Sequence, residues 1–168
     1  SAVYICRFLF GISPISAETI KNNDLVNIQE LDSTILVDLK YTTTDNFMNM
    51  DMYGDLETCY LRKNPAEMLL RANQYLKETN PKLNLLIYDG LRPRSIQRKL
   101  WNALDEVPET ERTQYVADPE KGSIHNYGAA VDLTLAHENG SPLDMGTKYD
   151  HFGELAFPAL EDSLFSIG

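Results

Sequence analysis

The alternation of apolar and polar residues predicts short strands, separated by helices and by long polar loops. Strand-like patterns, in which β-branched and apolar residues alternate or cluster, occur at 25–41 (most clearly at 34–41), 83–88 and 129–135. Residues 42–60 are rich in Asn, Asp and Gly, and residues 139–142 have the sequence NGSP. Both of these segments are therefore predicted to be loops or turns.

One helix is predicted after the first long loop. Its apolar positions repeat with helical spacing, at Met68, Leu69, Ala72, Tyr75 and Leu76. Asn64 suits the N-cap and Pro65 the first helical position, because proline there loses no internal hydrogen bond. Asn80-Pro81 is expected to end the helix, since proline cannot continue it.

A second helix is predicted at 95–104, with Ser95 as its cap. Residues 107–122 are expected to form a loop with a short helical stretch, and a weaker helical pattern recurs at 157–164. Strands and helices thus mix along the chain without a repeat. This order predicts an α+β fold, in which helices pack against a small sheet.

Composition narrows the classes of function. The chain has 168 residues, which suits one domain. Its formal charge is −10, and an acidic surface repels phosphate backbones, so nucleic-acid binding is not expected. The sequence contains no run of eighteen apolar residues, so no membrane span is predicted. Cys6 and Cys59 match no zinc or redox spacing, and the sequence leaves open whether they form a disulfide or remain thiols.

The first residues differ in character from the rest. Residues 3–15 are mostly apolar, with a lone Arg7, and the small residues of Ile15-Ser16-Ala17 follow. This pattern is typical of the end of a secretory signal, and a first packed element of the domain is the alternative. We therefore divide the chain into a signal remnant or extension at 1–17 and one domain at 18–168. The first interpretation favours the cell envelope, and the second leaves a cytoplasmic location open.

The segment 123–132 (SIHNYGAAVD) carries the most specific pattern. His125 lies in a predicted turn, and Asp132 follows inside a strand, where a carboxylate among apolar neighbours is costly unless it is paired or bound to a metal. In that strand Ala130, Asp132 and Thr134 share one face, and Val131, Leu133 and Leu135 share the other. Gly128 would let the turn bring His125 close to Asp132. Zinc accepts both ligand types; a capping aspartate and a surface histidine are the alternative.

A second pattern, 88–93 (YDGLRP), directly follows the predicted buried strand. Pro93 favours an extended conformation at Arg92. A guanidinium held there can bind a carboxylate or stabilise an oxyanion. A surface arginine in a tight turn is the alternative.

These patterns together resemble the D-alanyl-D-alanine dipeptidases of the vancomycin-resistance type, which are zinc peptidases acting on peptidoglycan termini. Four stretches carry the resemblance, in the family's order: 38–47, 88–93, 123–135 and 145–150. The resemblance implies an α+β fold with a small, mostly antiparallel sheet. It also implies one catalytic zinc ion, held by His125 and Asp132, and an oxyanion-stabilising role for Arg92.

The resemblance further implies a substrate site. Ser123 would line it, and Asp150 would receive the substrate's ammonium group with Tyr41 nearby. The implied reaction is hydrolysis of D-Ala-D-Ala to D-alanine. A D,D-carboxypeptidase of the same superfamily is a second possibility, and a non-catalytic module that binds peptidoglycan fragments is a third. The oligomeric state is not encoded in any pattern.

One expected motif is missing from the 168 residues. The family places its general base and its third zinc ligand in a Glu-x-x-His motif beyond the position of Asp150, and no such motif occurs here. We therefore expect the domain to be incomplete at its C-terminal side; loss of catalysis is the alternative. His137 and His151 match no ligand position of the family.

Overall fold

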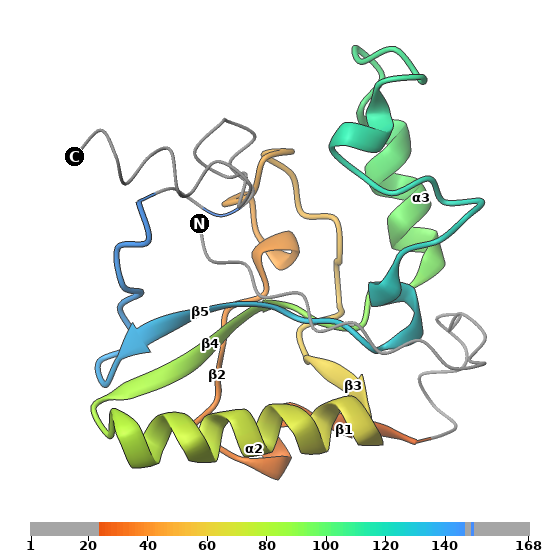
Figure 1. Cartoon of the computed structure of the whole chain (residues 1–168). Helices are drawn as coiled ribbons and strands as arrows, with labels where there is room; N and C mark the ends of the chain where they lie inside the picture. Colours follow the sequence, from red (N-terminus) through yellow and green to blue (C-terminus); the bar gives the residue numbers. More distant parts are fainter. Residues whose placement is uncertain (1–23, 147–148, 150–168) are drawn as a thin grey trace, which may run out of the picture.

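The computed structural model describes residues 24–146 and residue 149 (Figure 1). Its strands and helices follow one another in this order: β1 (Leu25–Asn27), α1 (Ile28–Leu31), β2 (Leu36–Val37), η2 (Lys40–Thr42), β3 (Tyr60–Arg62), α2 (Lys63–Thr79), β4 (Leu83–Asp89), α3 (Arg94–Ala103), η3 (Arg112–Gln114), η4 (Ile124–Tyr127) and β5 (Asp132–His137). The η elements are 3-10 helices. None of the described helices is long and apolar enough to cross a membrane.

Two small sheets organise the fold. The larger has the strand order β2-β4-β5, with β2 parallel and β5 antiparallel to the central β4. The smaller pairs β1 with β3 in antiparallel fashion. Helix α2 lies along one face of the larger sheet, and α3 stands beyond the end of β4 (Figure 1). The expected α+β fold, with a mostly antiparallel sheet, is confirmed.

Both helices predicted before residue 105 are present, but the residues predicted to cap them do not do so. Helix α2 begins at Lys63, because the chain enters it directly from β3, so Asn64 lies inside the helix and caps nothing. It ends as predicted, with the Asn80 N–H donating to the Leu76 carbonyl (2.7 Å). Helix α3 begins at Arg94 with Pro93 at the N-cap, so the predicted capping role of Ser95 is also wrong.

The strand predictions were accurate for β4 and less so elsewhere. At 34–41 only Leu36–Val37 form a strand, because Leu39 turns the chain by accepting hydrogen bonds from the Thr42 N–H (3.1 Å) and hydroxyl (2.7 Å). Strand β5 runs from Asp132 to His137, so it begins and ends later than the strand predicted at 129–135. The helical pattern predicted at 157–164 lies outside the described residues.

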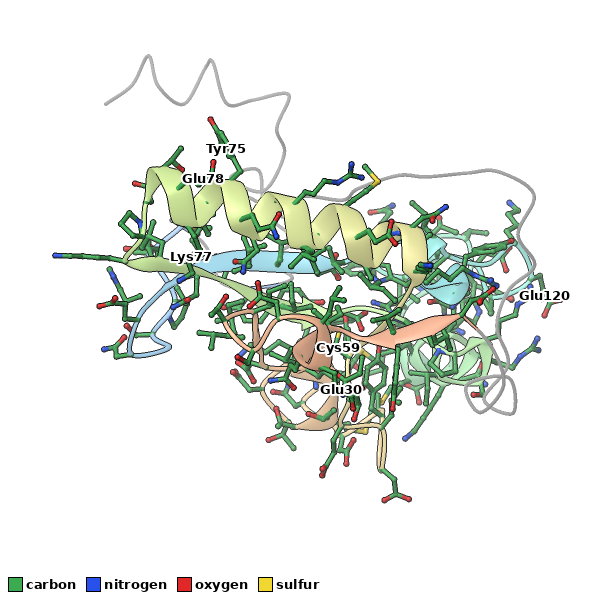
Figure 2. The ribbon with its side chains drawn as sticks, turned by 90° about the horizontal axis from the view of Figure 1, so that it is seen from below. Glu30, Cys59, Tyr75, Lys77, Glu78 and Glu120 are labelled. Atoms are coloured by element: carbon green, nitrogen blue, oxygen red, sulfur yellow. The ribbon has the colours of Figure 1, made fainter. Side chains whose placement is uncertain are left out.

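The end of β4 packs unusually closely on the segment before β3. A Cβ atom added to Gly90 would lie 2.5 Å from the Cys59 sulfur and 3.2 Å from the Tyr60 carbonyl oxygen. The Leu91 N–H donates to that same carbonyl (2.9 Å). Glycine is therefore required at position 90, and the contact fixes where the chain leaves the sheet. Cys59, labelled in Figure 2, is fully buried and forms no disulfide within the described part of the chain.

Candidate metal centre

A tightly capped turn presents His125. Ser123 is the N-cap of η4: its hydroxyl oxygen accepts from the His125 N–H (3.4 Å), and its own N–H donates to the Asn126 side chain (2.7 Å). Gly128 ends the turn with φ +63°, a conformation that favours glycine. These bonds fix the backbone of the turn, so the imidazole leaves it in a defined direction.

His125 and Asp132 face each other, as the sequence predicted. The His125 Nδ1 atom lies 2.8 Å from the Gly90 carbonyl oxygen, which can only accept, so Nδ1 carries the hydrogen. In the neutral ring the lone pair is then on Nε2, which lies 3.4 Å from the Asp132 Oδ1 atom. Two electron-rich atoms at that distance need a proton or a cation between them.

The donor set fits a zinc ion. Nitrogen and oxygen ligands that bind zinc tetrahedrally at about 2.0–2.2 Å are separated by roughly 3.3–3.5 Å. The Nε2–Oδ1 distance falls in this range. A ligating histidine commonly donates its other N–H to a backbone carbonyl, as His125 does to Gly90. His125 and Asp132 are therefore suited to hold a metal on their facing atoms.

Asp89 belongs to the same cluster, and the sequence analysis missed it. One ligand atom from each of Asp89, His125 and Asp132 lies within 4.8 Å of the others. Asp89, however, is fully buried and accepts four hydrogen bonds. They come from the Tyr53 hydroxyl, the Gly90 N–H (2.9 Å), and Nε (3.0 Å) and Nη2 of Arg92. Its oxygens are thus already occupied, which distinguishes it from Asp132.

Arg92 is held beside this cluster by bonds on every side. Besides its two bonds to Asp89, its Nη1 donates to the Gln97 side chain (3.2 Å). Its backbone N–H donates to the His125 carbonyl (3.0 Å), and its carbonyl accepts from the Asn126 side chain (2.7 Å). The arginine loop and the histidine turn are therefore one connected unit.

Tyrosine rings cover the other side of the cluster. The Tyr149 hydroxyl donates to the Asp132 Oδ2 atom (3.0 Å), which leaves Oδ1 toward His125. The Tyr149 ring lies 5.1 Å from that of Tyr88 and 6.2 Å from that of Tyr41. The Arg92 guanidinium lies 5.2 Å from the Tyr41 ring centre. Tyr41, the predicted substrate residue, thus lies beside Arg92 and beside the Tyr149 ring that contacts Asp132.

Two other candidate residues have different outcomes. His137 is exposed, at the end of β5 away from Asp132, and does not approach the cluster. Asp150, predicted to receive the substrate ammonium, lies outside the described residues, as does His151.

Comparison with known proteins identifies the family. Residues 21–163 match the model of the D-ala-D-ala dipeptidase family. The chain belongs to this family. It is also 34% identical, over 131 residues, to the D-alanyl-D-alanine dipeptidase of Escherichia coli (strain K12). That alignment covers 78% of this chain and 63% of the relative, so the chain spans less than two-thirds of the relative's length.

The charges of this dipeptidase-family site are mutually dependent. Burial disfavours the charged imidazole, yet the neighbouring carboxylates of Asp132 and Asp89 together outweigh burial and raise the pKa of His125. Burial likewise disfavours ionised Asp132, but the His125 charge and hydrogen bond lower the pKa of this carboxyl overall. A proton and a metal ion therefore compete for the space between these two side chains, because metal binding requires the deprotonated imidazole.

An apolar groove of about 720 Å³ lies on the α2 side of the sheet in this family member. Its lining includes Leu61, Met68, Leu76, Leu85, Leu133 and Leu135. Ala130 and Thr134 also contribute to its lining. Tyr75, labelled in Figure 2, stands on α2 at the groove with 67% of its surface exposed.

Proposed function

We propose that this chain carries the metal-binding part of a zinc-dependent dipeptidase, which hydrolyses D-Ala-D-Ala to two molecules of D-alanine. One observation supports this most strongly. The Nδ1–H of His125 is committed to the Gly90 carbonyl, so its Nε2 lone pair is aimed at the Asp132 carboxylate at a separation suited to one zinc ion. Membership of the dipeptidase family supports a peptidase activity for this pair of metal-binding residues.

His125 and Asp132 would hold the zinc, and the hydrogen bonds to Gly90 and Tyr149 orient them. A bound zinc supplies Lewis acidity toward the scissile carbonyl and lowers the pKa of water. The buried charged side chains of the described range include no glutamate. We therefore assign no general base among the described residues.

Arg92 is suited to stabilise the negative charge that develops on the carbonyl oxygen. Asp89 and Gln97 engage three of its N–H donors. A guanidinium has five such donors, so two remain for a reacting oxygen. Because the group is already fixed, little reorganisation is needed as the charge forms.

Substrate selection would rest on charge at the amino end. Asp150 would pair with the free ammonium of the dipeptide, near the ring of Tyr41, and Ser123 would line the pocket. Acylation of that nitrogen removes the charge, so longer peptidoglycan chains would bind poorly. This separates the dipeptidase from a D,D-carboxypeptidase.

The test measures zinc content by native mass spectrometry and D-alanine release from D-Ala-D-Ala and from N-acetyl-D-Ala-D-Ala. It uses this chain and its full-length gene product. We expect the full-length product to hold one zinc and to release D-alanine from the free dipeptide alone. Arg92→Ala should lower turnover by about 100-fold or more, as for other oxyanion donors, and keep the zinc. His137→Ala is the matched control and should change neither.

Three outcomes contradict the proposal. Cleavage of the acetylated dipeptide at equal rate would favour a carboxypeptidase. Zinc and dipeptide binding without any cleavage by the full-length product would favour a binding module. Unchanged turnover in Arg92→Ala would make this arginine structural.

A further inference from the structure

Asp89 is placed to orient a neighbour and not to bind metal. It is fully buried, at the very end of β4. Both of its oxygens accept two hydrogen bonds, and one of them receives both donors from the Arg92 guanidinium. A paired contact of this kind fixes the plane of a guanidinium as well as its distance. The plane of Arg92 decides where its remaining N–H groups point.

Tyr53 connects this carboxylate to a distant part of the chain. It lies in the long loop between η2 and β3, is 6% exposed, and donates its hydroxyl to Asp89. Its backbone N–H donates to the Tyr41 carbonyl (3.0 Å), and the two rings lie 5.8 Å apart. Burial and the Asp89 charge raise the pKa of Tyr53 well above its usual value, so it remains a donor.

We propose that Tyr53 and Asp89 are positioning residues, which set the orientation of the Arg92 guanidinium for oxyanion stabilisation without taking part in metal binding. The inference rests on the proposed function. It adds that the loop carrying Tyr53 controls the arginine and the Tyr41 ring together, because one residue contacts both.

A merely structural role for this pair makes different predictions. If Tyr53 and Asp89 only stabilised the fold, their loss would lower the free energy of unfolding. Any effect of their loss on turnover would then add to the effect of losing Arg92. If Asp89 were a ligand, its loss would release zinc. If the two residues act through Arg92, their effects on turnover vanish once Arg92 is gone, since contributions through one group are not additive.

The experiment compares Tyr53→Phe and Asp89→Asn, each alone and combined with Arg92→Ala, in the full-length gene product. Tyr53→Phe keeps the ring and its packing and removes only the hydroxyl. We expect kcat to fall about 10-fold in Tyr53→Phe and about 100-fold in Asp89→Asn, since small misplacements of a catalytic group cost up to such factors. KM and zinc content should change less than twofold. In the Arg92→Ala background neither change should lower kcat further.

A second measurement does not depend on turnover. The Nε–H resonance of Arg92 in a nitrogen-15 NMR spectrum reports its bond to Asp89 directly. We expect a slowly exchanging Nε–H in the unmodified protein, faster exchange in Tyr53→Phe, and loss of the protection in Asp89→Asn. Tyr75→Phe, an exposed tyrosine on α2, is the matched control and should alter neither the resonance nor kcat.

The two measurements separate the two proposals. Absence of D-alanine release from the unmodified full-length protein would end the proposed function, whereas the NMR exchange rates would still decide whether Tyr53 and Asp89 orient Arg92. Zinc loss in Asp89→Asn, full additivity with Arg92→Ala, or an unchanged Nε–H in both variants would overturn the positioning role.

Discussion

The two faces of β5 differ in chemistry, because one carries polar contacts and the other carries apolar side chains. On one face Asp132 makes contacts of fixed distance and direction with His125 and Tyr149. On the other, Leu133 and Leu135 are half-buried and border the apolar groove beneath α2. The first face depends on a few polar atoms in a fixed arrangement, and the second depends on the apolar surface area that it buries. Changes to the two faces should therefore appear in different measurements.

The largest expected effect is on metal binding by the polar face. Asp132→Ala removes one of two facing ligands, so we expect zinc affinity to fall by more than the roughly 10–100-fold that loss of an outer-shell partner costs. Dialysis against a competing chelator, followed by zinc analysis, measures this. Leu133→Ala is the neighbouring control and should retain zinc. Normal zinc content in Asp132→Ala would remove Asp132 from the ligand set.

The next effect concerns stability and the apolar face. Replacing a fully buried leucine by alanine lowers the free energy of unfolding by about 2–5 kcal/mol. Leu133 is only half-buried beside an open groove. We therefore expect Leu133→Ala to lower the free energy of unfolding by about 1–2 kcal/mol, measured by urea denaturation. A loss above that range would mean that the groove is filled in solution.

A smaller effect should depend on pH. In metal-free protein the pKa of His125 is raised by folding. Its contribution to the free energy of unfolding is therefore complete below the unfolded pKa of about 6.5 and is lost as pH rises through the folded value. With zinc the sign reverses, because zinc requires the deprotonated imidazole. Urea titrations across pH, with chelator and with zinc, should give opposite slopes. Equal slopes would contradict the pairing of His125 with Asp132.

The smallest effect is expected at the rim of the groove. Tyr75 is mostly exposed, so Tyr75→Ser should change the free energy of unfolding by no more than about 0.5 kcal/mol. Thermal unfolding followed by circular dichroism is sufficient to test this. A clear destabilisation would show that the tyrosine ring covers more of the groove in solution than its exposure indicates.

The two faces also differ in what the sequence could predict. The spacing of His125 and Asp132 predicted a facing pair, because a turn followed by a strand leaves few other arrangements. Asp89 could not be found in this way. Simple alternation puts it on the face of Leu85 and Ile87, but an irregularity between Ile87 and Asp89 sets it opposite Asp132. Such bulges re-aim single side chains and leave no clear mark in the sequence.

The helix caps failed for a related reason. Asn64 is a good cap by residue type, yet β3 runs directly into α2, so the N-cap position falls on Arg62, whose side chain makes no capping hydrogen bond. The strand predicted at 34–41 failed because Leu39 and Thr42 close a turn, which overrides β-propensity. In both places contacts between neighbouring elements decided the local structure, whereas β4 was predicted well because its burial is continuous along the sequence.

The close packing of Gly90 on Cys59 has a consequence for chemical probing. Burial and the Asp89 charge raise the pKa of the Cys59 thiol, so the folded protein offers almost no thiolate there. Alkylating reagents can react only when the segment before β3 separates from the end of β4. The labelling rate at Cys59, resolved from Cys6 by peptide mass, thus reports how often the backbone behind Asp89 and Arg92 opens.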